Sequence, residues 1–160
     1  EKVVAFSNTY LKNKQVLVSL KKNHINSFDD MTGKTLGVQS GSSGYESLEN
    51  NPKLLKDKIA KKTPVQYDTF TNAFLDLNAG RIKGLLIDSV YASYYIKHEA
   101  NSADYQETQG TFKSEDFAVG MRKGDKTMKR KINAGLKTLK ANGTLDKINK
   151  KWFGNQKVEN

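Results

Sequence analysis

The sequence contains no cysteine and only two histidines among its 160 residues. The absence of cysteine excludes disulfides, cysteine-ligated metal sites and catalysis by a thiol. The two histidines leave few groups that could act as a general base near neutral pH. His24 falls in a loop rich in Lys and Asn, and His98 falls at the polar end of an expected helix. We therefore interpret both side chains as solvated.

No apolar run approaches the length of a membrane-spanning helix. Residues 1–6 are too short and too polar for a signal peptide, so we expect the chain to begin after a processing site or to be a fragment. The chain is long enough for one domain or for two small lobes. Its seven Phe, seven Tyr and one Trp residues are sufficient to anchor a core.

Arginine is also scarce, because only three of the 27 basic residues are Arg although the net charge is +10. Arg supplies the planar fork that recognises phosphates and base edges, whereas Lys is a solvated point charge. The many Lys residues of the C-terminal 40 positions fall between apolar helix positions, which is typical of a solvated helix face. We predict no nucleic-acid partner, and attraction to an anionic wall or membrane surface stays open as an alternative.

The chain is organised around residues 34–46, Lys-Thr-Leu-Gly-Val-Gln-Ser-Gly-Ser-Ser-Gly-Tyr-Glu. Residues 35–38 form a short apolar run that predicts a buried strand. Ser43 and Glu46 have the spacing of a capping box, which predicts a helix beginning at Ser43. The free N–H groups and the dipole of such a helix start favour an anion. The same pattern also fits an ordinary strand-to-helix turn.

Strand patterns and amphipathic helix patterns alternate along the chain. Strands are predicted at residues 3–6, 15–20, 35–38, 64–67, 82–87, 105–109 and 116–121, and helices at residues 43–48, 70–77, 89–96, 128–139 and 145–152. This order predicts an α/β fold with an open, mostly parallel sheet flanked by helices. Because ligands of such sheets bind beyond the carboxyl ends of the strands, the turns after Val38 and Ile87 should share one rim.

Asp88 lies at that expected rim, directly after a predicted strand. Its carboxylate can bind a ligand ammonium group, or it can cap the helix that follows. Ser40, Ser42 and Ser43 offer hydroxyl and backbone N–H donors at the other turn. The pair suits a zwitterion, with the ligand carboxylate at the helix start and the ligand ammonium at Asp88.

The patterns of the common catalytic and metal sites are missing from this rim. Residues 41–44, Gly-Ser-Ser-Gly, are not the Gly-x-Ser-x-Gly of a serine hydrolase. The turn lacks the Gly-Lys-Ser/Thr ending of a phosphate-binding loop, and no cluster of His, Asp and Glu recurs at the intervals of metal ligands. We predict no catalytic residue, no metal and no cofactor.

Six short motifs, in order over essentially the whole chain, resemble a known family. They are Phe-Ser-Asn-Thr-Tyr at residues 6–10, Gly-Lys-Thr-Leu-Gly-Val-Gln-Ser-Gly-Ser at 33–42, Asp-Leu-Asn-Ala-Gly-Arg at 76–81, Leu-Ile-Asp at 86–88, Phe-Ala-Val-Gly-Met-Arg-Lys-Gly at 117–124, and Asn-Gly-Thr at 142–144 with Lys-Trp-Phe-Gly at 151–154. The chain resembles the type II periplasmic or extracellular solute-binding proteins of polar amino acid ABC transporters (bacterial solute-binding protein family 3). It departs from the family at Thr9, where Pro is usual, and at Lys83-Gly84, where an acidic residue and Ala are usual.

The resemblance implies a type II periplasmic-binding-protein fold, in which two α/β lobes close on one amino acid. Residues 15–115 would form a complete ligand-binding lobe 2. Residues 1–14 would be a remnant of lobe 1 with the hinge entry, and residues 116–160 the hinge return with the C-terminal helices of lobe 1. Family members carry most of lobe 1 before the Phe-Ser element, so this chain resembles a protein that lacks most of its N-terminal lobe 1.

The resemblance also implies a set of ligand-binding residues, namely Gln39, Ser40, Gly41, Ser42, Ser43 and Asp88. Ser42 and Ser43 match positions whose N–H and hydroxyl groups meet the ligand carboxylate. Asp88 matches the acidic residue that takes the ligand ammonium, and Gln39 matches a position that faces the ligand side chain. Ile87 stands where some relatives carry a polar residue, which leaves the exact amino acid open.

Without most of lobe 1, the apolar stripes of the two C-terminal helices, including Trp152, would be exposed or paired with another copy. We expect self-association or mobile C-terminal helices, and weak or no amino-acid binding by the truncated chain. The predicted function is that of an extracellular or periplasmic protein, peripheral to the cytoplasmic membrane, which delivers a polar amino acid to an ABC permease. The alternatives are the ligand-sensing domain of a membrane receptor and an enzyme on the same fold.

Overall fold

The computed structural model describes residues 3–153 of the chain. The chain divides into two compact units, which are described separately. Unit 1 consists of residues 1–13 and 114–160, and unit 2 consists of residues 14–113. Unit 2 is therefore a continuous insertion in unit 1.

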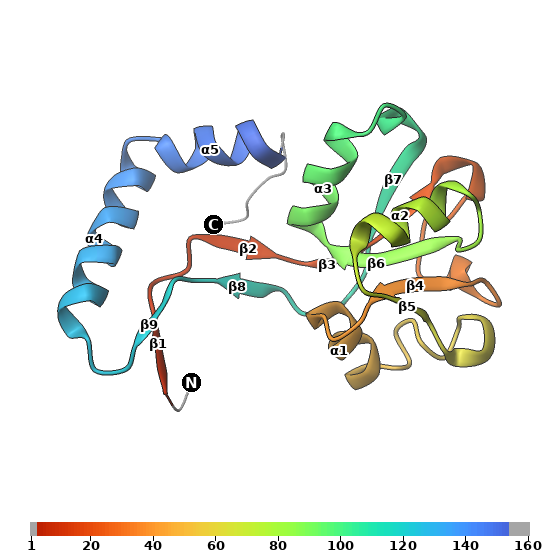
Figure 1. Ribbon diagram of the computed structural model, residues 1–160, viewed down its shortest axis with the longest axis horizontal. Helices are drawn as coiled ribbons and strands as arrows, with labels where there is room; N and C mark the ends of the chain where they lie inside the picture. The colour runs from red at the N-terminus through yellow and green to blue at the C-terminus, as the bar shows by residue number, and fades with distance from the viewer. Residues whose placement is uncertain (1–2, 154–160) are drawn as a thin grey trace. The chain divides into compact units, whose positions relative to one another are not determined.

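Unit 2 is built on a five-stranded sheet with the order β5-β4-β6-β3-β7 (Figure 1). Its strands are β3 (Gln15–Leu20), β4 (Leu36–Gln39), β5 (Val65–Tyr67), β6 (Gly84–Asp88) and β7 (Tyr105–Gln109). Each lies within two residues of a strand that the apolar patterns predict. β6 occupies the middle of the sheet, and four of its five residues are buried.

One strand runs against the others. β4 pairs in parallel with β5 and with β6, whereas β3 pairs antiparallel with β6 on one side and with β7 on the other. Four strands therefore share one direction, as the predicted mostly parallel sheet requires, and the sheet is mixed because β3 is inserted among them. This inversion has a consequence for the site, because the first residue of β3 lies at the edge where β4 and β6 end.

Three α-helices and four short 3-10 segments accompany the sheet. They are α1 (Ser43–Asn50), α2 (Phe70–Asn78), α3 (Ser89–His98), η1 (Lys21–Asn23), η2 (Asp29–Met31), η3 (Ala60–Lys62) and η4 (Ser102–Asp104). The Thr69 hydroxyl accepts a hydrogen bond from the Asn72 N–H and so caps α2. Gly80 follows the end of α2 with a φ of 74°, a conformation that favours glycine after a helix.

Each face of the sheet carries its own apolar core. Alternate residues of β3 point to opposite faces, so Val16 and Val18 join one cluster and Leu17 joins the other. The first cluster packs α2 and α3 on the sheet, with Phe74 stacked on Tyr95 at a centroid distance of 4.0 Å. The second cluster includes Leu48 of α1. This two-sided burial explains why all six residues of β3 are buried.

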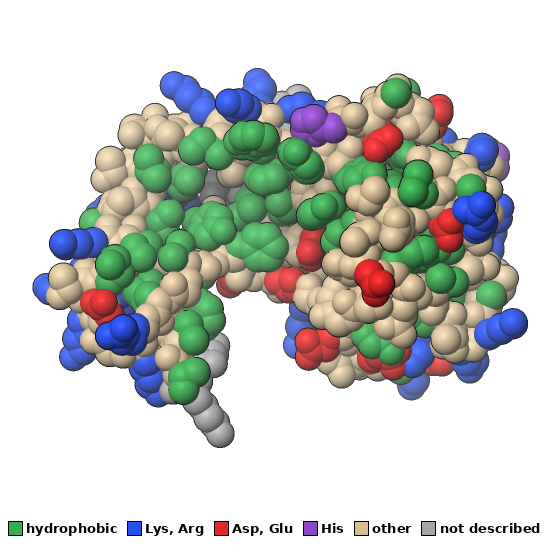
Figure 2. Space-filling model, in the orientation of Figure 1, with side chains coloured by type: hydrophobic (Ala, Val, Ile, Leu, Met, Phe, Trp, Pro, Cys, Tyr) green, Lys and Arg blue, Asp and Glu red, His purple; other side chains and the backbone are tan. Residues whose placement is uncertain are grey.

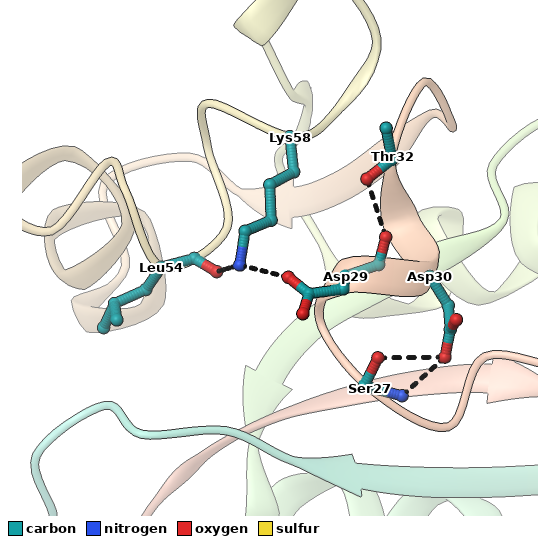
Figure 3. Close-up of polar contacts among 6 residues, drawn as sticks. All are labelled: Ser27, Asp29, Asp30, Thr32, Leu54 and Lys58. Atoms are coloured by element: carbon teal, nitrogen blue, oxygen red, sulfur yellow. Dashed lines mark hydrogen bonds and ion pairs between the residues drawn. The ribbon is translucent and has the colours of Figure 1, made fainter.

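The segment between α1 and β5 contains η3 but no α-helix or strand, and a polar contact ties it to η2 (Figure 3). Its Lys58 side chain forms an ion pair with Asp29 at 2.6 Å and donates a hydrogen bond to the Leu54 carbonyl at 3.0 Å. The neighbouring turn is closed by Asp30, whose carboxylate accepts hydrogen bonds from the N–H and hydroxyl of Ser27. The Lys58–Asp29 pair thus joins the segment to η2, and the burial of Leu55 in the second cluster places the segment over the core.

Unit 1 contains two separate two-stranded ladders. β1 (Val4–Phe6) pairs antiparallel with β9 (Gly120–Arg122), and β2 (Leu11–Asn13) pairs antiparallel with β8 (Glu115–Phe117). The prediction of one strand over residues 116–121 is therefore wrong, because Ala118 and Val119 separate β8 from β9. β2 lies in a segment for which no strand was predicted, since three residues with a polar centre carry too little pattern.

Two helices complete unit 1, namely α4 (Lys126–Ala141) and α5 (Thr144–Phe153). The Asp125 carboxylate accepts a hydrogen bond from the Met128 N–H and caps α4. Gly143 separates the helices with a φ of 73°, between the two helices that the sequence predicts. Neither helix contains a buried residue, and the Trp152 side chain is 45% exposed.

Candidate ligand-binding rim

The candidate site lies where two parallel strands of unit 2 end. The register pairs Leu36 with Gly84 and Val38 with Leu86, so β4 and β6 reach the same edge of the sheet. β4 ends at Gln39 and β6 ends at Asp88. Parallel strands that are followed by helices expose their carboxyl ends to ligands. The two turns that the sequence places on one rim are therefore adjacent in the structure.

The turn after β4 is held by its own hydrogen bonds. The Gln39 carbonyl accepts from the Ser42 hydroxyl at 2.8 Å, and the Ser40 N–H donates to the Tyr67 carbonyl at 2.9 Å. Gly41 has a φ of 64°, a left-handed conformation that costs glycine little and most other residues considerably more. Ser40 and Gly41 are both exposed. This turn presents backbone to solvent beside the start of α1.

α1 begins at Ser43, as predicted, but its cap is the preceding residue. The Ser42 hydroxyl accepts a hydrogen bond from the Tyr45 N–H at 3.1 Å, so Ser42 occupies the N-cap position. The capping-box spacing pointed to Ser43 because Glu46 lies three residues beyond it. The two hydroxyl groups therefore have different roles. The Ser42 hydroxyl caps the helix, and the Ser43 hydroxyl accepts a hydrogen bond from the Gln15 side chain.

Asp88 is the last residue of β6 and precedes α3. Its side chain makes no capping hydrogen bond to α3, so the interpretation of Asp88 as a side-chain cap is wrong. Ser89 is the first residue of α3, and its hydroxyl accepts a hydrogen bond from the Lys14 N–H at 3.3 Å. The half-buried Asp88 carboxylate accepts a hydrogen bond from the Gln15 side chain at 2.7 Å.

Gln15 is the residue of this site that sequence reasoning missed. It is the first residue of β3 and pairs directly with Asp88 across the antiparallel ladder. Its Nε2 atom donates to Asp88 Oδ1 at 2.7 Å and to Ser43 Oγ at 3.1 Å. The sequence showed a polar residue opening a mostly apolar strand, but only the inverted direction of β3 brings that residue to the rim.

The six predicted residues thus lie close together, in two groups that differ in their hydrogen bonds. Ser43 and Asp88 meet the same Gln15 amide. The other four residues, Gln39, Ser40, Gly41 and Ser42, form the adjoining turn. Gln39 is half-buried, and its Nε2 atom donates to the Asp68 carbonyl at 3.0 Å. The arrangement offers an anion the N–H groups of a helix start and offers a cation a carboxylate.

Titratable side chains outside the rim include both histidines. Within residues 3–153, no three His, Cys, Asp or Glu side chains gather closely enough to hold a metal ion. His24 is exposed after η1, and exposed His98 has its Nδ1 atom 2.6 Å from the Tyr94 carbonyl oxygen at the end of α3. Within the same residues, no helix is long and apolar enough to cross a membrane.

Comparison with known proteins identifies the family. The sequence profile of the bacterial extracellular solute-binding proteins, family 3, matches residues 1–155. The chain belongs to this family. Curated relatives of this family 3 chain include ABC transporter arginine-binding protein 1 of Escherichia coli, which is 29% identical over 95% of the chain and 60% of the relative. The arginine-binding extracellular protein ArtP of Bacillus subtilis is 29% identical over 98% of the chain and 59% of the relative.

Solved structures give the same family and fold. An ABC uptake transporter substrate-binding protein from Streptococcus pneumoniae with bound histidine has a TM-score of 0.85 and is 48% identical, over 98% of this chain and 64% of that one. A polar amino acid ABC uptake transporter substrate-binding protein from Streptococcus thermophilus has a TM-score of 0.76 and is 50% identical. The match covers 97% of this chain and 58% of that one. The predicted type II periplasmic-binding-protein fold is confirmed. The chain spans about 60% of the length of the two curated relatives named above.

Proposed function

We propose that this protein is the extracellular substrate-binding component of an ABC importer, which captures a polar amino acid and delivers it to a permease. The pairing of Asp88 with the hydroxyl-rich start of α1 supports this proposal most directly, because the two turns offer complementary groups to a zwitterion. The relatives support it as well, since they are binding proteins for arginine and histidine rather than enzymes. The function would require no catalytic group and no cofactor.

The proposed binding mode assigns one role to each turn. The N–H groups around Ser42 and Ser43, together with the Ser43 hydroxyl, would receive the ligand carboxylate, because the first turn of α1 carries unsatisfied donors and the positive end of the helix dipole. The Ser42 hydroxyl already donates to the Gln39 carbonyl. Asp88 would receive the ligand ammonium. Gln39 would face the ligand side chain, and Ser40 and Gly41 would let the ligand approach the backbone. Residues 15–115 would be the ligand-binding lobe, and residues 1–14 and 116–160 would belong to the other lobe and the hinge.

Removal of one carboxylate charge tests this assignment. Asp88→Asn keeps the size of the side chain but removes the charge that would pair with the ammonium group. We expect the Kd for the natural amino acid to rise by about tenfold to a hundredfold, because a charged hydrogen bond is worth about 1.5–3 kcal/mol. Isothermal titration calorimetry with L-histidine and L-arginine measures this on the full chain, including any sequence that precedes residue 1.

The matched control is Asp104→Asn. Asp104 is exposed in η4, before the start of β7, and so lies at the opposite end of the sheet from the rim. Its replacement changes the net charge by the same amount and should leave the Kd unchanged. Equal Kd values for Asp88→Asn and the parent protein would remove Asp88 from the binding site. We expect the 160 residues alone to bind more weakly than a chain of the length of the relatives.

We also propose that the 160-residue chain self-associates through unit 1. Figure 2 shows hydrophobic side chains gathered over unit 1, at the left. Met128, Ile148 and Trp152 are each more than two-fifths exposed, and a pocket of about 490 Å³ opens between residues 8–12 and helices α4 and α5. Exposed apolar surface of this kind favours association. Sedimentation velocity should show dimers or larger species that Trp152→Ser reduces, and a monodisperse monomer would contradict this.

A further inference from the structure

A buried amide joins the two halves of the proposed site. Gln15 is only 2% exposed, although it is a polar residue at the end of a strand. Its Nε2 atom donates to the Asp88 carboxylate at 2.7 Å and to the Ser43 hydroxyl at 3.1 Å. Ser43 and Asp88 are 45 positions apart in the sequence, and Ser43 begins α1 whereas Asp88 ends β6. One side chain thus fixes the separation between the start of α1 and the end of β6.

The chemistry of the amide suits this task. A primary amide nitrogen carries two hydrogens, so a single Gln15 side chain can donate to both acceptors at once. The bond to Asp88 involves a charged acceptor, which makes it stronger than a bond between neutral groups. Because Gln15 is buried, loss of these bonds would not be fully replaced by bonds to water. The side chain is therefore restrained, and so are the groups to which it donates.

Gly44 makes room for this amide. A Cβ atom added to Gly44 would lie 2.7 Å from Gln15 Oε1, which is closer than nonbonded atoms approach. Gly44 lies in the first turn of α1 and has no positive φ, so its backbone does not require glycine. Glycine disfavours a helix relative to alanine, yet it stands here. The packing of Gln15 gives a physical reason for a glycine at this position.

We propose that Gln15 is a positioning residue for the amino-acid site. It holds the Asp88 carboxylate and the Ser43 hydroxyl in fixed relation, so that the groups for the ligand ammonium and the ligand carboxylate are set before the ligand arrives. Preorganised sites lose less entropy on binding and so bind more tightly. This inference rests on the proposed function and adds to it a residue that need not touch the ligand.

The first test is Gln15→Met, which keeps the length of the side chain but removes both donors. We expect the Kd for L-histidine or L-arginine to rise about tenfold in the full chain, measured by calorimetry. Ser19→Ala is the matched control in the same strand. Ser19 is fully buried and its hydroxyl has no hydrogen-bond partner among the described residues, so its removal should leave the Kd within twofold.

The second test retains every polar group. Gly44→Ala should displace the Gln15 amide and raise the Kd about fivefold, although alanine favours the helix. Gly135→Ala in α4 is the matched control, because a Cβ atom there would meet nothing within 4 Å. If Gln15→Met fails to fold, this pair still decides the question. Unchanged Kd values for Gly44→Ala would overturn the proposal.

A double-mutant cycle separates positioning from a merely structural role. If Gln15 acts through Asp88, Gln15→Met should raise the Kd less than threefold when Asp88 is already Asn. An undiminished tenfold effect in that background would show that Gln15 supports the fold in general, and would overturn the proposal. If the parent protein binds and Asp88→Asn weakens binding while Gln15→Met does not, only this inference fails. If Asp88→Asn also leaves the Kd unchanged, the proposed site fails with it.

Discussion

The two units of this chain differ in how much apolar surface they bury. Unit 2 encloses two apolar clusters on the two faces of one sheet, and its strand β3 is buried along its whole length. Unit 1 has two short ladders and two amphipathic helices without a buried residue on either helix. Two-stranded ladders are marginally stable by themselves. The difference indicates that unit 2 carries most of the stability of the chain.

Charge divides in the same way. Unit 2 has 13 Lys and Arg residues against 11 Asp and Glu, a net charge of +2, whereas unit 1 has 14 against 6, a net charge of +8. In unit 2, ion pairs join Lys56 to Glu49 and Arg81 to Asp76. In unit 1, most of the excess lies on α4 and α5. The +10 of the whole chain is thus mainly a property of the two helices and says little about the rim.

The largest expected effect comes from matched Leu→Ala changes in the two units. Leu17 is fully buried in unit 2, and Leu136 of α4 is half-buried in unit 1. We expect Leu17→Ala to lower the free energy of unfolding by about 2–5 kcal/mol, since it leaves a cavity. Leu136→Ala should cost less than about 1 kcal/mol, because little surface is uncovered. Urea titration followed by circular dichroism measures both, and equal losses would contradict the comparison.

Matched Gly→Ala changes should have smaller effects of opposite sign. A Cβ atom at Gly84 of β6 would lie 2.7 Å from Leu17 Cδ1 and 3.0 Å from Met31 Sδ, so Gly84→Ala should cost about 1–3 kcal/mol through overpacking. At Gly135 of α4 the space is open, so Gly135→Ala should stabilise by about 1 kcal/mol through helix propensity. The same titrations test both, and a destabilising Gly135→Ala would show a contact on α4 that the structure lacks.

The smallest effect concerns acid stability in unit 2. Hydrogen bonds from the Tyr67 hydroxyl and from Arg81 lower the pKa of Asp76 below its usual value near 3.8. Because the folded pKa lies below the unfolded one, this contribution to stability is present above about pH 4 and disappears as the pH falls through the folded pKa. Asp76→Asn should therefore flatten the loss of stability between about pH 5 and pH 2.

Tyr67→Phe is the companion variant, because it removes the donor that contributes most to the lowered pKa of Asp76. It should also reduce the loss of stability on acidification, but by a smaller amount than Asp76→Asn, since Arg81 remains. The free energy of unfolding, measured by urea titration at each pH, decides the question. If both variants lose stability with falling pH as steeply as the parent protein does, the Asp76 interactions do not persist in solution.

The sequence predicted the strands and helices of unit 2 well because their apolar patterns are strong. Residues 15–20 are apolar enough to be recognised as a buried strand, but nothing in them states that the strand runs against its neighbours. That direction depends on contacts between distant segments, and it alone brings Gln15 to Asp88. For this reason the sequence could predict the candidate site residues at positions 39–43 and 88, whereas it could not predict Gln15.

Unit 1 was less predictable for a physical reason. β2, β8 and β9 are three residues long, and strands of this length show no clear alternation. Their boundaries follow from pairing across more than 100 residues of intervening chain. The cap of α1 could not be predicted to the residue. Ser42 and Ser43 are equally good capping residues, and only the geometry selects Ser42.

Thermal melting of the full chain with each of the twenty L-amino acids tests the proposed function most directly. A ligand that binds the folded state well above its Kd raises the Tm. We expect a clear rise with one or a few polar amino acids, L-histidine and L-arginine first among them, and a much smaller rise in Asp88→Asn. No rise with any amino acid, in a folded protein that includes any sequence preceding residue 1, would contradict the assignment of this rim to an amino acid.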